Sequence, residues 1–205
     1  MLDRYALSYI TPPLYRLARQ LDALGIKSDQ ITVSGFALGM LALPALAWEH
    51  YGLALLLIIL NRLADGLDGI VARLTQPTDA GAYLDIVLDF LFYSGVVCGF
   101  AWADPTRNAL AAATLIFAFM GTGSSFLAFA ILAERQKIRS LHYPSNGFYY
   151  IGGLTEGTET IALFVAFCLF PAWFPILAYT FAALCFITTI TRVIGGYYTL
   201  QQDIS

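Results

Sequence analysis

Four aspartates stand in two closely spaced pairs inside apolar stretches of the sequence. Asp65 and Asp68 are three residues apart, and Asp85 and Asp89 are four residues apart. Both spacings place the two carboxylates of a pair on one face of a helix. An isolated carboxylate in the hydrocarbon of a bilayer costs about 2.5–3.5 kcal/mol, so four of them require compensation. Facing carboxylates suit a hard divalent cation such as Mg2+ or Mn2+, which prefers oxygen ligands.

Small residues and one arginine surround these carboxylates. Gly66, Gly69 and Gly81 remove side chains where a ligand or a neighbouring backbone approaches closely. Close packing of membrane helices is the better explanation of any one of these glycines taken alone. Arg73 adds a planar guanidinium, which matches the geometry of a phosphate. Metal ligands, small residues and an arginine together indicate a site for a diphosphate.

The composition places these side chains in a membrane protein. Of the 205 residues, 59% are hydrophobic and only 12% are charged, which is too few to cover a water-soluble surface. The net charge of −3 gives no reason to expect nucleic acid as a partner.

Six apolar runs are long enough to cross a bilayer, which requires about 20 residues of helix. The predicted spans are approximately 30–48, 52–73, 79–102, 109–133, 148–170 and 173–198. The expected fold is therefore all-α, a polytopic membrane protein with one domain over residues 1–205. Within it we expect a juxtamembrane segment, 1–27, and a six-helix bundle, 30–198.

The juxtamembrane segment is too charged to span the bilayer. Over residues 3–25 its Leu and Tyr positions recur at nearly helical spacing, with Arg16 and Arg19 on the other face. This pattern predicts an amphipathic helix that lies in the membrane interface. Pro12 and Pro13 are expected to interrupt it, because proline cannot donate a helical hydrogen bond.

The basic residues beside the span ends predict the orientation. Cytoplasmic ends of membrane spans carry an excess of Lys and Arg. If the N-terminus is cytoplasmic, only Arg107 flanks the opposite side. The cytoplasmic side then receives Arg4, Arg16, Arg19, Lys27, Arg73, Arg135, Lys137 and Arg139. We therefore expect both termini on the cytoplasmic side.

This orientation brings the two aspartate pairs to a similar depth. At 1.5 Å per residue, Asp68 and Asp65 lie roughly 8 and 12 Å from the cytoplasmic end of the second span. Asp85 and Asp89 lie roughly 9 and 15 Å into the third span from the same side. The short connection containing Pro77 predicts that the two helices are antiparallel neighbours. Only Arg62, Arg73 and Arg192 fall near this depth, so salt bridges are not expected to compensate the four carboxylates.

The residues from Asp65 to Arg73, followed by Gly81, Asp85 and Asp89, resemble the signature of the CDP-alcohol phosphatidyltransferase family. That signature reads Asp-x-x-Asp-Gly-x-x-Ala-Arg and then Gly-x-x-x-Asp-x-x-x-Asp, and every defining residue is present. Seven residues separate Arg73 from Gly81 where eight are usual. The difference lies in the connection between two spans and leaves both helix faces intact.

The resemblance implies an enzyme of phospholipid biosynthesis. It would transfer a phosphatidyl group from CDP-diacylglycerol or a related CDP-linked lipid to an alcohol and release CMP. The four aspartates would hold two Mg2+ or Mn2+ ions, and Asp89 would also act as general base. The residues implied to bind the CDP donor are Asp68, Gly69, Ala72, Arg73 and Gly81. Serine, glycerol 3-phosphate, an inositol phosphate and a lipid alcohol all remain open as acceptors.

The resemblance also implies a homodimer and a bacterial inner-membrane location. The third, fourth and sixth spans are apolar enough to permit a dimer. Small residues on them would allow close approach of helices, although packing within one chain explains them equally well. These residues are Gly95, Gly99, Gly121 and Gly123.

The remaining charged residues near the cytoplasmic side are candidates for binding the acceptor. They are Arg135, Lys137, Arg139, Arg192, Glu156 and Glu159. The basic loop between the fourth and fifth spans is better explained by contact with anionic lipid headgroups. Arg192 is the stronger candidate, because it lies inside a span. The two glutamates either pair with Arg192 or Arg62 or contact the acceptor.

Two other functional classes use acidic residues inside a membrane. A cation- or proton-coupled transporter would continue its polar residues to the far side. Here the outer halves of the second and third spans are almost wholly apolar, which favours a one-sided enzyme cavity. An intramembrane prenyltransferase also uses Asp and Asn with magnesium. It normally carries its two acidic motifs on separated helices.

Overall fold

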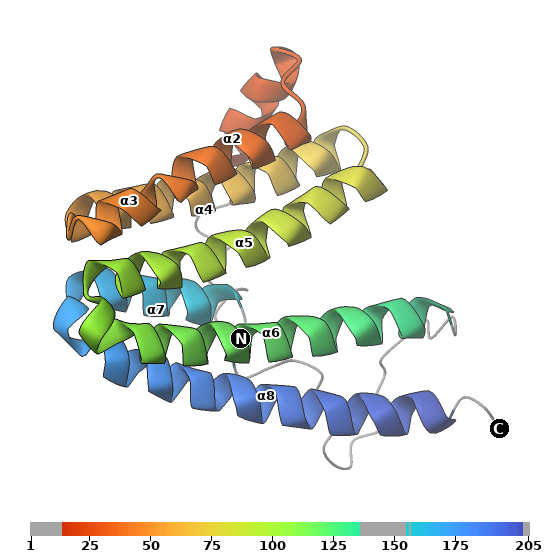
Figure 1. Cartoon of the computed structure of the whole chain (residues 1–205). Helices are drawn as coiled ribbons and strands as arrows, with labels where there is room; N and C mark the ends of the chain where they lie inside the picture. Colours follow the sequence, from red (N-terminus) through yellow and green to blue (C-terminus); the bar gives the residue numbers. More distant parts are fainter. Residues whose placement is uncertain (1–13, 136–154, 156, 203–205) are drawn as a thin grey trace.

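The computed structural model describes residues 14–135, 155 and 157–202, and the described elements are helices (Figure 1). Residues 14–23 form a first helix. The helices that follow are α2 Ser28–Met40, α3 Ala42–Ala47, α4 Tyr51–Leu74, α5 Asp79–Ala103, α6 Pro105–Arg135, α7 Gly157–Leu169 and α8 Phe174–Gln202. A short 3-10 helix, η1 Pro171–Trp173, precedes α8. The all-α prediction is confirmed for this part of the chain.

Four helical segments have both the length and the apolar composition to cross a membrane. They are Ser28–Ala47, Asp79–Ala103, Pro105–Arg135 and Pro171–Gln201. Helix α4 is 24 residues long, but its charged side chains keep its composition from identifying it as a span. The described part of α7 is only 13 residues long. The count of six spans therefore stays a prediction.

The first span is a helix with one interruption. Helices α2 and α3 are separated at Leu41, three residues before Pro44. Proline lacks the N–H that would bond to the carbonyl four residues earlier, and its ring crowds that carbonyl. The helix is therefore interrupted at one residue and then continues to Ala47.

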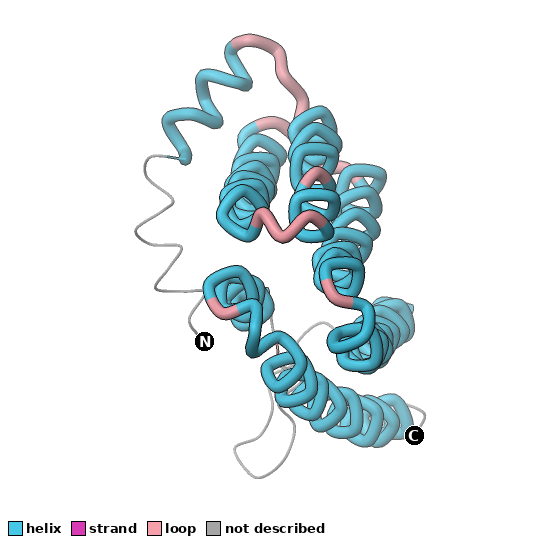
Figure 2. The backbone as a smooth tube through the Cα atoms, turned by 60° about the vertical axis from the view of Figure 1, so that its left-hand side comes forward, coloured by secondary structure: helices cyan, strands magenta, loops and turns pink. Residues whose placement is uncertain are grey.

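The helix of residues 14–23 lies beside the bundle (Figure 2). Leu14, Ala18 and Leu21 share one face and pack against Leu67 and other apolar side chains of α2 and α4. The two arginines of this helix are exposed. The apolar face of this helix thus packs on the rest of the protein. A position in the membrane interface stays a prediction. The two prolines expected to interrupt it lie outside the described residues.

Helices α4 and α5 run antiparallel as predicted (Figure 1), but their backbones stay further apart than neighbouring helices usually do, and side chains such as Tyr51 and Phe100 bridge the space. Both pack against α2 and α3, and α4 also packs against α7. The connection between them ends at Thr78, whose hydroxyl accepts a hydrogen bond from the Gly81 backbone N–H at 3.0 Å. This cap fixes the start of α5. The separation leaves room for polar side chains between the halves of α4 and α5 that flank this connection.

An apolar core joins the helices at the end of the molecule away from the connection between α4 and α5. Its largest buried side chains include Phe92 and Phe100 of α5 and Phe164, Phe167 and Phe174 of the C-terminal part. The rings of Phe100 and Phe174 stack with their centroids 4.9 Å apart. The described members of this core are apolar, and the buried Asp68 with its acidic neighbours lies outside it, toward the connection between α4 and α5.

The four glycines considered for a dimer interface face side chains of the same chain. A Cβ atom added to each would lie within 3.2 Å of a neighbour. Those neighbours, in the order of the glycines, are Leu43, Leu46, Thr189 and Phe90. Packing within the chain therefore accounts for these glycines, and they give no support for a dimer.

Candidate active site

Three of the four aspartates form one cluster. Asp65 and Asp68 of α4 and Asp85 of α5 each place a carboxylate oxygen within 4.8 Å of the others. The prediction that the two pairs meet at one depth is therefore confirmed for these three. Oxygen atoms at such separations from two helices can share one cation. Asp89, one turn further along α5, lies outside this cluster.

The buried member of the cluster has an oxygen without a partner. Asp68 is only 6% exposed, and its Oδ2 atom makes no hydrogen bond within the described part of the chain. A buried carboxylate oxygen left unpaired is energetically costly. A hard divalent cation would satisfy it and offset the repulsion among the three acids. The donor set thus fits the metal that the sequence predicts.

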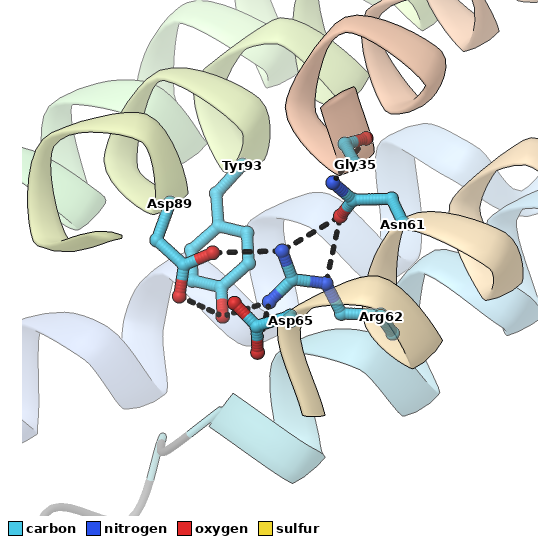
Figure 3. A network of polar contacts seen from close by, with 6 residues as sticks. All are labelled: Gly35, Asn61, Arg62, Asp65, Asp89 and Tyr93. Carbon is cyan, nitrogen blue, oxygen red and sulfur yellow. Dashed lines mark hydrogen bonds and ion pairs between the residues drawn. The ribbon is translucent and has the colours of Figure 1, made fainter. Parts of the chain in front are cut away.

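Asp89 is paired with an arginine (Figure 3). Arg62 Nη2 donates to Asp89 Oδ1 at 2.7 Å. Arg62 Nη1 lies 3.4 Å from Asp65 Oδ2. The expectation that salt bridges would not compensate the acids was therefore wrong for Asp89 and, more weakly, for Asp65. One guanidinium placed between α4 and α5 reaches both carboxylates.

Helix α2 sets the position of the α4 turn that carries Arg62. A Cβ atom added to Gly35 would lie 2.5 Å from the Cβ atom of Ala64, and one added to Gly39 would lie 2.8 Å from the Asn61 side chain. Only glycine permits this approach of the two backbones. At this contact Asn61 Nδ2 donates to the Gly35 carbonyl at 3.0 Å. The close approach of α2 therefore fixes a buried amide next to the site.

A cavity beside the three-acid cluster brings together most of the predicted donor-binding residues. Asp68, Gly69 and Ala72 of α4 line it together with Gly81 and Asp85 of α5. At Gly81 an added Cβ would meet the Asp29 Oδ1 atom at 2.9 Å. A side chain at this position would therefore narrow the cavity.

The predicted phosphate ligand Arg73 lies at the edge of this region. It is exposed on the last turn of α4, and its Nη1 atom is 3.5 Å from the Cβ position of Gly69. Its guanidinium therefore reaches back toward the glycine of the signature.

Several residues of the site were not predicted from the sequence. Ser28, Asp29 and Thr32 of α2 line the cavity, and Tyr93 of α5 contacts Asp89. The residues of α2 carry no local signal, because only long-range packing brings them to the signature. Arg62 did carry a signal: it is a charged residue in an apolar run, three positions before Asp65.

The candidate acceptor residues are only partly described. Glu156, Lys137 and Arg139 lie outside the described residues, and Arg135 is exposed at the end of α6. The described contacts of Arg192 include a hydrogen bond from Nη1 to the Thr122 carbonyl at 3.3 Å. Its guanidinium also lies 5.5 Å from the ring centroid of Phe126. Glu159 is half-buried in the first turn of α7. A role of these residues in acceptor binding stays a prediction.

Comparison with known proteins agrees with this geometry. The family model for CDP-alcohol phosphatidyltransferase matches residues 27–191. A relative from Escherichia coli (strain K12), named inner membrane protein YnjF, is 58% identical over 202 residues, which are 98% of each chain. Archaetidylinositol phosphate synthase of Pyrococcus horikoshii is 31% identical over 194 residues, 94% of this chain and 95% of the relative.

Solved structures show the same fold. Phosphatidylinositol phosphate synthase of Mycobacterium tuberculosis with CDP-DAG bound has a TM-score of 0.67 at 21% identity, covering 90% of this chain and 93% of that chain. A structure of the same enzyme with manganese and citrate also has a TM-score of 0.67 at 21% identity, covering 90% and 88%.

The fold and the site together define a membrane transferase of phospholipid synthesis. The chain belongs to the CDP-alcohol phosphatidyltransferase family. Membership of this family argues against the two alternatives considered above, the transporter and the prenyltransferase.

Proposed function

We propose that the protein transfers a phosphatidyl group from CDP-diacylglycerol, or a related CDP-linked lipid, to the hydroxyl of an alcohol and releases CMP. One observation carries the proposal: the three-acid cluster borders a cavity lined by Asp68, Gly69, Ala72 and Gly81 of the family signature. The CDP-DAG bound in the similar mycobacterial structure supports a donor of this kind.

Two divalent cations, Mg2+ or Mn2+, are the proposed cofactors. Asp65, Asp68 and Asp85 would hold them, with Asp89 as a further ligand on the evidence of the signature. Bound cations would neutralise the diphosphate and stabilise the charge that develops on the leaving CMP. The manganese in the second mycobacterial structure supports this class of ion.

The chain's own residues would carry the remaining steps. Gly69 and Gly81 leave space for the nucleotide, and the Arg73 guanidinium offers paired donors to a phosphate. Asp89 would accept the proton of the acceptor hydroxyl, as a general base within reach of it. The hydroxyl oxygen then bonds to the phosphorus that carries diacylglycerol. The bond from that phosphorus to the CMP oxygen breaks, and CMP leaves with the bonding electrons.

A phosphorylated alcohol is the proposed acceptor. By the predicted orientation, Arg192 and the basic residues Arg135, Lys137 and Arg139 offer cationic groups on the same side as the site. Glu156 and Glu159 would accept hydrogen bonds from hydroxyl groups of the same molecule. Two of the similar proteins are named as synthases of inositol phosphate lipids, which supports an anionic acceptor.

The proposed setting is the bacterial inner membrane. The name of the Escherichia coli relative and the apolar helices support this location. We infer six spans from the apolar runs, and cytoplasmic termini and a cytoplasmic site from the distribution of Lys and Arg. A homodimer is proposed on the family resemblance alone.

An acceptor panel tests the function. Purified protein in nanodiscs receives CDP-diacylglycerol, Mg2+ and one alcohol at a time: glycerol 3-phosphate, an inositol phosphate, serine or a lipid alcohol. We expect CMP release to rise with one of them, most strongly with a phosphorylated alcohol. The Asp85→Asn variant serves as the blank. CMP release that no alcohol stimulates would indicate hydrolysis and contradict the proposal.

A further inference from the structure

Arg62 is a largely covered cation that the family signature does not include. It stands in the middle of α4, and its side chain is only 15% exposed. A guanidinium in hydrocarbon costs about 2.5–3.5 kcal/mol on the insertion scale, so an intramembrane arginine points to a specific partner and a function.

The guanidinium of Arg62 is held by hydrogen bonds on its edge and by rings on its face. Nε and Nη2 donate to the Oδ1 atom of Asn61 at 2.8 and 2.6 Å. Nη1 donates to the Tyr93 hydroxyl at 3.2 Å. The Cζ atom lies 5.0 Å from the ring centroid of Phe92 and 5.3 Å from that of Tyr93. Contacts of this kind leave the plane of the group little freedom.

The hydrogen bonds form a chain that runs from α2 through α4 to α5 (Figure 3). The Gly35 carbonyl accepts from Asn61 Nδ2, and Asn61 Oδ1 accepts from Arg62. Arg62 Nη2 then donates to Asp89 Oδ1 at 2.7 Å. Because Asn61 is buried and held by α2, it fixes the position of the guanidinium independently of Asp89.

The two oxygens of Asp89 are held unequally. Oδ1 accepts the short bond from Arg62, while Oδ2 accepts a longer one, 3.4 Å, from the Tyr93 hydroxyl. Asp89 thus has one anchored oxygen and one loosely held oxygen. The anchor also holds this carboxylate beside the three-acid cluster without making it a member.

We propose that Arg62 is a positioning residue that anchors Asp89 beside the metal-binding carboxylates, so that the loosely held oxygen of Asp89 faces the acceptor hydroxyl. The inference rests on the proposed function, in which Asp89 accepts the acceptor proton. Arg62 itself contacts no reacting atom in this account and acts through Asp89.

The test uses the full chain in nanodiscs with the variants Arg62→Gln, Arg62→Lys, Asp89→Asn and the double variant Arg62→Gln/Asp89→Asn. We expect Arg62→Gln to lower the single-turnover rate about 10–100-fold at saturating donor, acceptor and metal, because a base displaced by about 1 Å is poorly aligned. Donor affinity should stay within about threefold, since the donor cavity is unchanged. Arg62→Lys should keep more of the rate, because it retains the charge. The matched control is Arg107→Gln, at the opposite end of the bundle.

The double variant shows whether Arg62 acts through Asp89. If it does, adding Arg62→Gln to Asp89→Asn should cause no further loss, because coupled residues are not additive. Independent, multiplying losses would overturn the proposal. An unchanged saturated rate in Arg62→Gln, or a loss confined to donor affinity, would also overturn it.

Mn2+ binding in the absence of donor gives a readout that does not depend on turnover. Removing a positive charge next to the acids should tighten Mn2+ binding about three- to tenfold in Arg62→Gln. Mn2+ binding weakened as severely as in Asp85→Asn would mean that Arg62 builds the three-acid cluster itself, and would refute the positioning role. A wild-type protein that never releases CMP would defeat the proposed function instead, while the Mn2+ comparison would still report on Arg62.

Discussion

Asp89→Asn is expected to lower the single-turnover rate about 10²–10⁴-fold, the usual contribution of a general base. Asparagine keeps the shape of the side chain and an oxygen that can accept from Arg62, so the anchor seen in Figure 3 survives. It cannot accept the proton of the acceptor hydroxyl. Donor affinity should fall less than in Asp65→Asn or Asp85→Asn, because Asp89 lies outside the three-acid cluster. Donor affinity and single-turnover rate are measured for all three variants.

The same variants can contradict this role. Donor affinity in Asp89→Asn could fall as severely as in the other two, with a rate that recovers at saturating donor and metal. Asp89 would then be only a metal ligand, and another group would have to accept the proton.

Removal of divalent metal is expected to abolish CMP release. The diphosphate of the donor and three clustered carboxylates repel one another strongly in a medium of low dielectric. Loss of a group that only orients a metal ligand weakens metal binding roughly 10–100-fold. Asp85 is a proposed ligand itself, so Asp85→Asn should weaken Mn2+ binding by more than that. The measurements are CMP release after chelation and Mn2+ binding by titration.

Asp104→Asn is the matched control for this experiment. Asp104 is an exposed aspartate at the other end of the third predicted span, where it accepts a hydrogen bond from the Arg107 backbone N–H. Mn2+ binding should be unchanged in this variant. Undiminished transfer after complete chelation would rule out the metal-dependent mechanism.

The helix boundaries could be predicted closely from the sequence. The second and third predicted spans, 52–73 and 79–102, correspond to α4 Tyr51–Leu74 and α5 Asp79–Ala103. Long apolar runs are a strong signal, because the bilayer requires continuous helices with satisfied backbone groups. The spacing of the aspartates likewise sufficed to predict that acids of α4 and α5 lie together, since helix geometry fixes which side chains share a face.

The pairing of Arg62 with Asp89 could not be predicted in the same way. The two residues are 27 positions apart, and their contact depends on how α4 and α5 lie relative to each other. Depth alone placed three arginines near the acids and did not show which of them would reach a carboxylate. The choice is made by Asn61, whose own position follows from the close approach of Gly35 and Gly39.

The role of α2 was also hidden from the sequence. A short connection between α4 and α5 suggested that their backbones pack closely on each other, whereas both backbones pack more closely on α2 and α3. Asp29 and Thr32 reach the donor cavity only because of this arrangement. Local patterns report on single helices, and the third helix that completes a site becomes visible only in the packed structure.

Isotope transfer from the acceptor tests the central claim most directly. The alcohol that gives the fastest CMP release is labelled with 18O in its hydroxyl group and incubated with CDP-diacylglycerol, Mg2+ and the protein. We predict that the lipid product retains the label in its phosphodiester bridge and that the released CMP carries none, because the acceptor oxygen attacks the phosphorus that bears diacylglycerol. Label in CMP, or a lipid product without label, would contradict phosphatidyl transfer.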